Sequence, residues 1–131
     1  MSATNKTAKE VIENRYKDVG MTVSEIKDMR AMIEKMPANN KFFDDVWSVL
    51  DSAGNLLLKK QADYGPKNIS QAPGGPLNGL RVRMFDKISR INNLIDTGAT
   101  PENESLRDSF MDLLNYSAIA MMILDDTWPK S

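Results

Sequence analysis

The chain has 131 residues, of which 41% are hydrophobic and 27% are charged, and its formal net charge is −1. These values are ordinary for one globular domain and give no sign of affinity for nucleic acid or membranes. The chain contains no cysteine and no histidine, which excludes disulfides, thiolate metal sites, cysteine nucleophiles and Ser-His triads. Its chemistry must use carboxylates, lysine, arginine, tyrosine and amides, and oxygen ligands of this kind suit Mg²⁺ or Mn²⁺.

Apolar residues recur at helical spacing along most of the chain, and no stretch alternates as a strand would. The sequence therefore predicts an all-α fold, a helical bundle of four to five helices. We expect an N-terminal helical extension over residues 1–40 and the main domain over residues 41–131. The expected helices span residues 4–18, 24–36, 41–62, 80–96 and 101–125.

Some ends and faces of these helices can also be predicted. Ser24 is the expected N-cap of the second helix.

Residues 63–78 break the helical pattern with two Gly- and Pro-rich stretches, which predicts a long loop of the kind that is usually functional. Residues 119–124 are apolar nearly all round, so we expect them to be buried in the bundle or, in part, at a subunit interface. The helix over residues 80–96 is expected to bury Met84, Ile88, Ile91 and Ile95.

A row of acidic residues lies on the last predicted helix. Glu104, Asp108, Asp112 and the amide Asn115 fall within an arc of about 80° at 100° per residue. Like charges one turn apart repel and weaken a helix by a few tenths of a kcal/mol per pair. Either a bound divalent cation or a facing row of lysines and arginines would offset this repulsion.

A mostly basic row lies on the preceding helix, where Arg83, Asp86, Lys87 and Arg90 fall within about 100° of arc. Consecutive helices joined by a short turn pack antiparallel, so the two rows could line one groove. In one interpretation, carboxylates hold Mg²⁺ against a nucleoside polyphosphate while the cations neutralise its phosphates. In the other, the rows form interhelical salt bridges and nothing else. The residues alone leave both interpretations open.

The segment 59–68 is basic and aromatic and ends a helix. Tyr64 could stack on a base while Lys67 or Asn68 reaches a phosphate. Alternatively, Tyr64-Gly65-Pro66 is only a helix stop in which the tyrosine anchors the packing.

Three groups of residues resemble the nucleotide-modification-associated domain family, which is common in bacteriophages and some bacteria. They are Asp63-Tyr64-Gly65 followed by Asn68, the run from Arg83 to Arg90, and Glu104 to Asp108 followed by Asp112 to Tyr116. The resemblance extends over residues 59–124, about half of the chain. The family is in turn similar to all-α nucleoside triphosphate pyrophosphohydrolases of the MazG and dimeric dUTPase kind.

This resemblance implies an enzyme dependent on Mg²⁺ (or Mn²⁺) that cleaves a nucleoside or deoxynucleoside triphosphate to the monophosphate and pyrophosphate. Asp86, Glu104 and Asp108 would be catalytic, and together with Asp112 they would hold the metal. The MazG pattern has Glu-Glu-x-x-Glu on the preceding helix, whereas this chain offers only Asp86 there. The implied substrate-binding residues are Tyr64, Lys67, Asn68, Arg83, Lys87, Arg90, Asn115 and Tyr116.

The alternative is a protein without catalytic activity that binds a nucleotide or a nucleotide-derived signal, or that engages a host protein through residues 119–124. In either case we expect a homo-oligomer that contacts neither membranes nor nucleic acid. No apolar run reaches the length of a membrane span, and the polar N-terminal stretch does not resemble a signal peptide. The expected location is the cytoplasm, which is the host cytoplasm if a phage encodes the protein.

Overall fold

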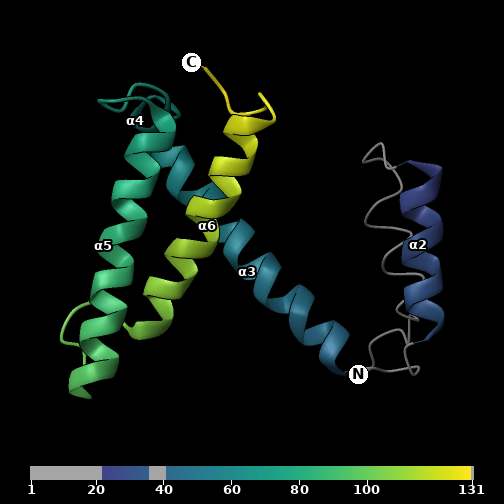
Figure 1. The fold of residues 1–131 in the computed structure, drawn as a ribbon, viewed down its shortest axis with the longest axis horizontal. Coiled ribbons are helices and arrows are strands. Elements are labelled where there is room, and N and C mark those ends of the chain that lie inside the picture. Colours follow the sequence, from purple (N-terminus) through teal and green to yellow (C-terminus); the bar gives the residue numbers. More distant parts are fainter. Residues whose placement is uncertain (1–21, 36–40, 131) are drawn as a thin grey trace. The chain divides into compact units, whose positions relative to one another are not determined.

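The computed structural model describes residues 22–35 and 41–130. Within these ranges the protein is all-α and contains no strand, which confirms the predicted fold class. None of the described helices is both long and apolar enough to cross a membrane. The predicted helix over residues 4–18 lies outside the described residues. The helices are α2 (Val23–Glu34), α3 (Lys41–Tyr64), α4 (Lys67–Ser70), α5 (Pro76–Thr97) and α6 (Leu106–Leu124), shown in Figure 1.

The chain divides into two compact units between residues 49 and 50, inside α3. The division predicted at residue 40 stays a prediction. In the first unit, Thr22 rather than Ser24 caps α2, because Thr22 and Glu25 form a capping box. The Glu25 backbone N–H donates to Thr22 Oγ1 at 3.1 Å, and the Thr22 N–H donates to Glu25 Oε1 at 3.3 Å.

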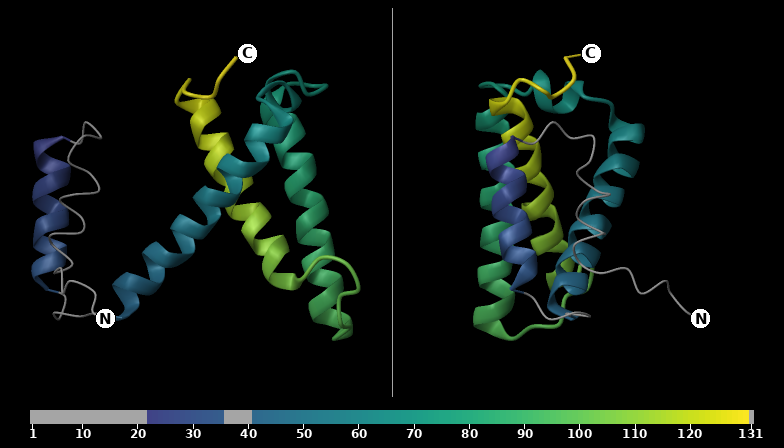
Figure 2. Two further views of the ribbon diagram at one scale, coloured as in Figure 1. Left: turned by 180° about the vertical axis from the view of Figure 1, so that it is seen from behind. Right: turned by 90° about the vertical axis from the view of Figure 1, so that its right-hand side faces the viewer.

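In the second unit, α5 and α6 pack side by side and run in opposite directions, as Figures 1 and 2 show. Gly98 ends α5 in the left-handed conformation, with φ +64°. Ser105 and Asp108 form a capping box at the start of α6. Because this cap begins α6 at Leu106 and not near residue 101, Glu104 precedes the helix and is not part of its acidic row.

The long loop predicted over residues 63–78 is only partly correct. α3 continues to Tyr64, and Gly65 then turns the chain with φ +69°. Pro66 is the N-cap of the short helix α4, and Pro76 is the first residue of α5. Proline suits these positions because its fixed φ is helical and its missing N–H would have no partner there. The prolines therefore begin helices here.

The core of the second unit lies where the end of α3, α4, the start of α5 and the end of α6 meet. Ile69, Leu80, Ile119 and Trp128 form a buried cluster, against which Leu57 and Tyr116 pack. Trp128 Nε1 also donates a hydrogen bond of 3.2 Å to the carbonyl oxygen of Pro66. The cluster thus holds together four elements that are far apart in the sequence.

The buried face of α6 is largely polar. Ser109, Asp112 and Asn115 are buried on it, whereas Met121 and Leu124 are 63% and 70% exposed within this chain. On α5, Ile91 is buried as predicted. The predictions for Ile88 and Ile95 are wrong, because these side chains are 46% and 58% exposed. The reason is that α5 turns its charged row toward α6.

Replacing Trp128 with alanine is expected to lower the free energy of unfolding by about 3–5 kcal/mol, because it removes the largest side chain of the core cluster. Trp128→Phe keeps most of the packing and should cost much less. Urea denaturation followed by circular dichroism measures both values. Phe85→Ala is the matched control because Phe85 is exposed. A loss below about 1 kcal/mol for Trp128→Ala would contradict this account of the core.

Candidate functional site

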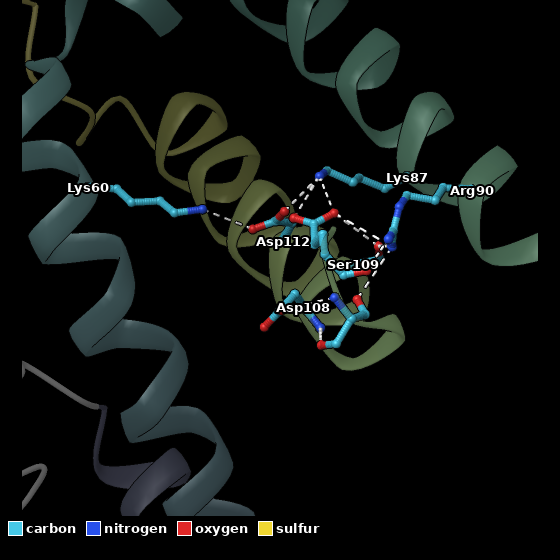
Figure 3. Close-up of polar contacts among 8 residues, drawn as sticks. Lys60, Lys87, Arg90, Asp108, Ser109 and Asp112 are labelled. Atoms are coloured by element: carbon cyan, nitrogen blue, oxygen red, sulfur yellow. Dashed lines mark hydrogen bonds and ion pairs between the residues drawn. The ribbon is translucent and has the colours of Figure 1, made fainter. Parts of the chain in front are cut away.

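An ion-pair network joins α5 to α6 at the centre of the second unit. Lys87 Nζ on α5 lies 2.9 Å from Glu104 Oε2 and 2.9 Å from Asp112 Oδ2. Lys60 Nζ on α3 lies 3.1 Å from the other oxygen of Asp112. Figure 3 shows both lysines pointing toward Asp112 from opposite sides. A facing row of cations, one of the two explanations for the acidic row, is therefore present.

Arg90 extends this network to the segment before α6. Its Nη1 donates to Ser109 Oγ at 2.6 Å, and its Nη2 donates to the carbonyl oxygen of Glu104. The Ser109 hydroxyl in turn donates to Glu104 Oε2 at 3.3 Å. Ser109 is 0% exposed, so these bonds satisfy a polar group that would otherwise be buried without a partner. The guanidinium thus fixes where Glu104 lies relative to α5.

The opposite charges in this network stabilise the ionised forms of Lys87 and Asp112. Burial favours the neutral amine of Lys87, but hydrogen bonds and attraction from Asp112 and Glu104 raise its pKa to about 12. Burial likewise favours the protonated form of Asp112, but hydrogen bonds from Lys87 and Lys60 and the charge of Lys60 lower its pKa below the usual value. Both groups are therefore charged near neutral pH.

The other two predicted acids have different surroundings. Asp108 is exposed, and its Oδ2 accepts a hydrogen bond of 3.1 Å from the Ser105 N–H. Hydrogen bonds with Ser105 lower the pKa of Asp108. Asp86 is exposed on α5, and none of the described ion pairs includes it. Across residues 22–35 and 41–130, no three acidic side chains gather closely enough to form a metal site by themselves.

Beside the network lies a pocket of about 280 Å³ formed by α3, α4, α5 and α6. It brings together six of the predicted site residues: Tyr64, Asn68, Arg83, Asp112, Asn115 and Tyr116. Lys67 is exposed and does not line this pocket, and neither do Lys87, Arg90, Glu104, Asp86 and Asp108. Lys87 nevertheless binds Asp112, which does line the pocket.

The sequence analysis missed five lining residues, which are Leu57, Lys60, Gln61, Ile69 and Ile119. Lys60 was detectable in principle, because it lies one helical turn before Tyr64 on the same face of α3. The apolar residues could not be distinguished from ordinary core, since they are also part of it or pack against it. Their position makes one end of the pocket apolar.

The lining of the pocket also contains charged and polar side chains. Lys60 and Arg83 contribute two cations against the single carboxylate of Asp112. Arg83 Nη2 donates a hydrogen bond of 3.1 Å to the carbonyl oxygen of Asn68, which holds α4 against α5. Lysine and arginine beside an apolar surface suit a ligand that combines a phosphate with a planar, weakly polar group.

The comparison with known families agrees with this chemistry. Residues 60–124 match a protein family described as nucleotide modification associated domain 1. Over these residues, just under half of the chain, the protein is similar to this family. The matched segment contains every lining residue of the pocket except Leu57, together with Lys87, Arg90 and Glu104. No curated protein and no solved structure matches the chain.

Lys87→Met is expected to lower the free energy of unfolding by about 1–3 kcal/mol near neutral pH, because it leaves Glu104 and Asp112 facing each other without their shared cation. The folded pKa of Asp112 lies below its usual value. The stabilisation from its ion pairs is therefore complete above the unfolded pKa, and is lost as the pH falls through the folded pKa. The difference between variant and wild type should accordingly narrow in acid.

Thermal unfolding followed by circular dichroism from neutral to acid pH measures this effect. Lys59→Met is the control, because it removes a neighbouring exposed lysine outside the described ion pairs. A Lys87→Met deficit that is the same at every pH would argue against the carboxylate network as its cause.

Proposed function

We propose that residues 50–130 bind a nucleoside or deoxynucleoside phosphate in the pocket between α3, α4, α5 and α6. The observation that carries this proposal is the pocket itself. Its lining combines the cations Lys60 and Arg83 with the apolar side chains of Ile69 and Ile119, and the family match covers almost all of this lining. A nucleotide likewise combines a charged part, the phosphate, with a weakly polar part, the faces of the base.

In this proposal, Lys60 and Arg83 contact the phosphate, because both carry a positive charge into the pocket. Asp112 holds Lys60 in place until the phosphate takes over part of that contact. Tyr64 and Tyr116 flank the nucleoside. Stacking of a base on an aromatic side chain contributes about 1–3 kcal/mol and tolerates different bases. Tyr64 is exposed in this structure, so a ligand would cover it.

The reaction that we propose for the bound nucleotide is the release of pyrophosphate from a triphosphate. Water adds to the α-phosphorus, the bond to the bridging oxygen of the β-phosphate breaks, and the monophosphate and pyrophosphate leave. The family resemblance supports this reaction. Glu104 and Asp112, which already share Lys87, are the acids best placed to hold Mg²⁺ together with phosphate oxygens. The metal would supply charge neutralisation and an activated water.

Binding without turnover is the second candidate function. The observation that favours it is that Glu104 and Asp112 are already neutralised by Lys60, Lys87 and Arg90. A divalent cation would have to displace Lys87, whose pKa is raised to about 12 by the same two acids. The basic pocket, by contrast, can take a phosphate without any metal.

Lys60→Ala is expected to weaken binding of deoxynucleoside triphosphates at least tenfold, because hydrogen bonds to charged groups contribute about 1.5–3 kcal/mol. Isothermal titration calorimetry with and without Mg²⁺ measures the dissociation constants. Lys59→Ala is the matched control, since it removes the same charge one residue away and outside the pocket. Equal binding by the two variants would remove Lys60 from the site. No binding of any nucleotide to the wild type would refute the proposed function.

Pyrophosphate release from a panel of nucleoside triphosphates with Mg²⁺ or Mn²⁺ tests the reaction. Glu104→Gln and Asp112→Asn are expected to lower the rate by at least a hundredfold, whereas Asp96→Asn, an exposed acid at the end of α5, should retain it. If Asp108→Asn is as active as the wild type, Asp108 serves only as the cap of α6. Binding without release from any triphosphate would select the second candidate function.

A further inference from the structure

Asn115 combines burial with a lack of protein partners. Its side chain is 7% exposed and lines the pocket, yet none of the described hydrogen bonds includes its carboxamide. Two neighbours on the same buried face of α6 differ in this respect. Asp112 is bound by Lys60 and Lys87, and Ser109 is bound by Arg90. Buried amides are normally hydrogen-bonded, so the partners of Asn115 would come from the contents of the pocket, either water or a ligand.

The position of Asn115 defines which part of a ligand it meets. Along α6 it follows Asp112 by three residues and precedes Ile119 by four, which places it about 4.5 Å and 6 Å from them along the helix axis. It therefore lies between the end of the pocket that holds Lys60 and the apolar end. A nucleotide whose phosphate contacts Lys60 and whose base packs toward Ile119 would therefore place its nucleoside beside the carboxamide.

We propose that Asn115 determines base specificity by hydrogen-bonding the polar edge of the nucleobase. This inference rests on the proposed function and assigns its ligand more narrowly. A carboxamide offers one acceptor and two donors in a plane, and it pairs with a base edge on which a donor lies beside an acceptor. The ligand class is therefore a nucleotide with an intact base edge, and a sugar phosphate without a base should bind much more weakly.

The chemistry of Asn115 also predicts how the preference can be changed. Asn115→Asp keeps the shape of the side chain but replaces its donor by a second acceptor. Bases that need a donor from the protein should then bind at least tenfold more weakly. Guanine, whose edge carries two neighbouring N–H donors, should lose least. Asn115→Leu removes the donor and the acceptor at similar volume.

The test compares binding of dCMP, dTMP, dAMP, dGMP and 2-deoxyribose 5-phosphate to the full chain by calorimetry, together with the melting temperature of each variant. We expect the wild type to bind at least one nucleotide tenfold or more tightly than the sugar phosphate. Asn115→Leu should weaken the nucleotide that the wild type binds most tightly at least tenfold, remove the differences among the four bases, and leave sugar phosphate binding unchanged. Its melting temperature should stay the same or rise, because no protein hydrogen bond is lost. Asn92→Leu, on the exposed face of α5, is the control.

Three outcomes would overturn the inference. If Asn115→Leu keeps the wild-type order of the four bases, or weakens nucleotides and sugar phosphate equally, Asn115 does not determine base specificity, while the proposed function stands. If Asn115→Leu lowers the melting temperature by several degrees and the isosteric Asn115→Asp keeps the wild-type order of bases, the amide is structural. If the wild type binds none of these nucleotides, the proposed function and this inference fall together.

Discussion

The ion pair of Lys87 with Glu104 and Asp112 is the interaction on which the rest of the second unit depends. The two carboxylates would repel each other, and α6 would not turn its polar face inward without a cation there. Lys87 binds both at 2.9 Å, and Lys60 reaches Asp112 from α3. Because the shared charges lie between helices, they decide which face of α5 meets α6, and they leave Ile88 and Ile95 exposed.

The pocket follows from this arrangement and from the core cluster beside it. Ile69, Leu80, Ile119 and Trp128 hold α4 and the ends of the longer helices together. Lys60 and Asp112 connect α3 to α6 at the polar side of the same space. A buried apolar end and a charged end are thus built by two different interactions that meet at α6. Such a division is what a ligand with a phosphate and a base requires.

The metal ion of the proposed reaction would compete with the lysines of this network. Glu104 and Asp112 are hard oxygen ligands suited to Mg²⁺, but here they stabilise the charge of Lys87. In the proposed function, a nucleotide would change this balance, because its phosphates would bind Lys60 and Arg83 and would share a metal with the carboxylates. The two proposed functions, nucleotide binding alone and pyrophosphate release, therefore differ in one physical respect. Only the second requires the ion pairs of Lys87 with Glu104 and Asp112 to break.

The sequence by itself determined the all-α fold, the end of α5 to within one residue, and six of the eleven residues that line the pocket. These features depend on local spacing, on the conformational freedom of glycine, and on motifs within one helix. The tertiary structure decided which row of α5 faces α6, that Asp108 caps its own helix while Asp112 binds two lysines, and that Lys60 and Gln61 belong to the pocket. Those outcomes depend on contacts between residues up to 52 positions apart. Helical periodicity groups residues on one helix, but only packing between helices determines which groups meet.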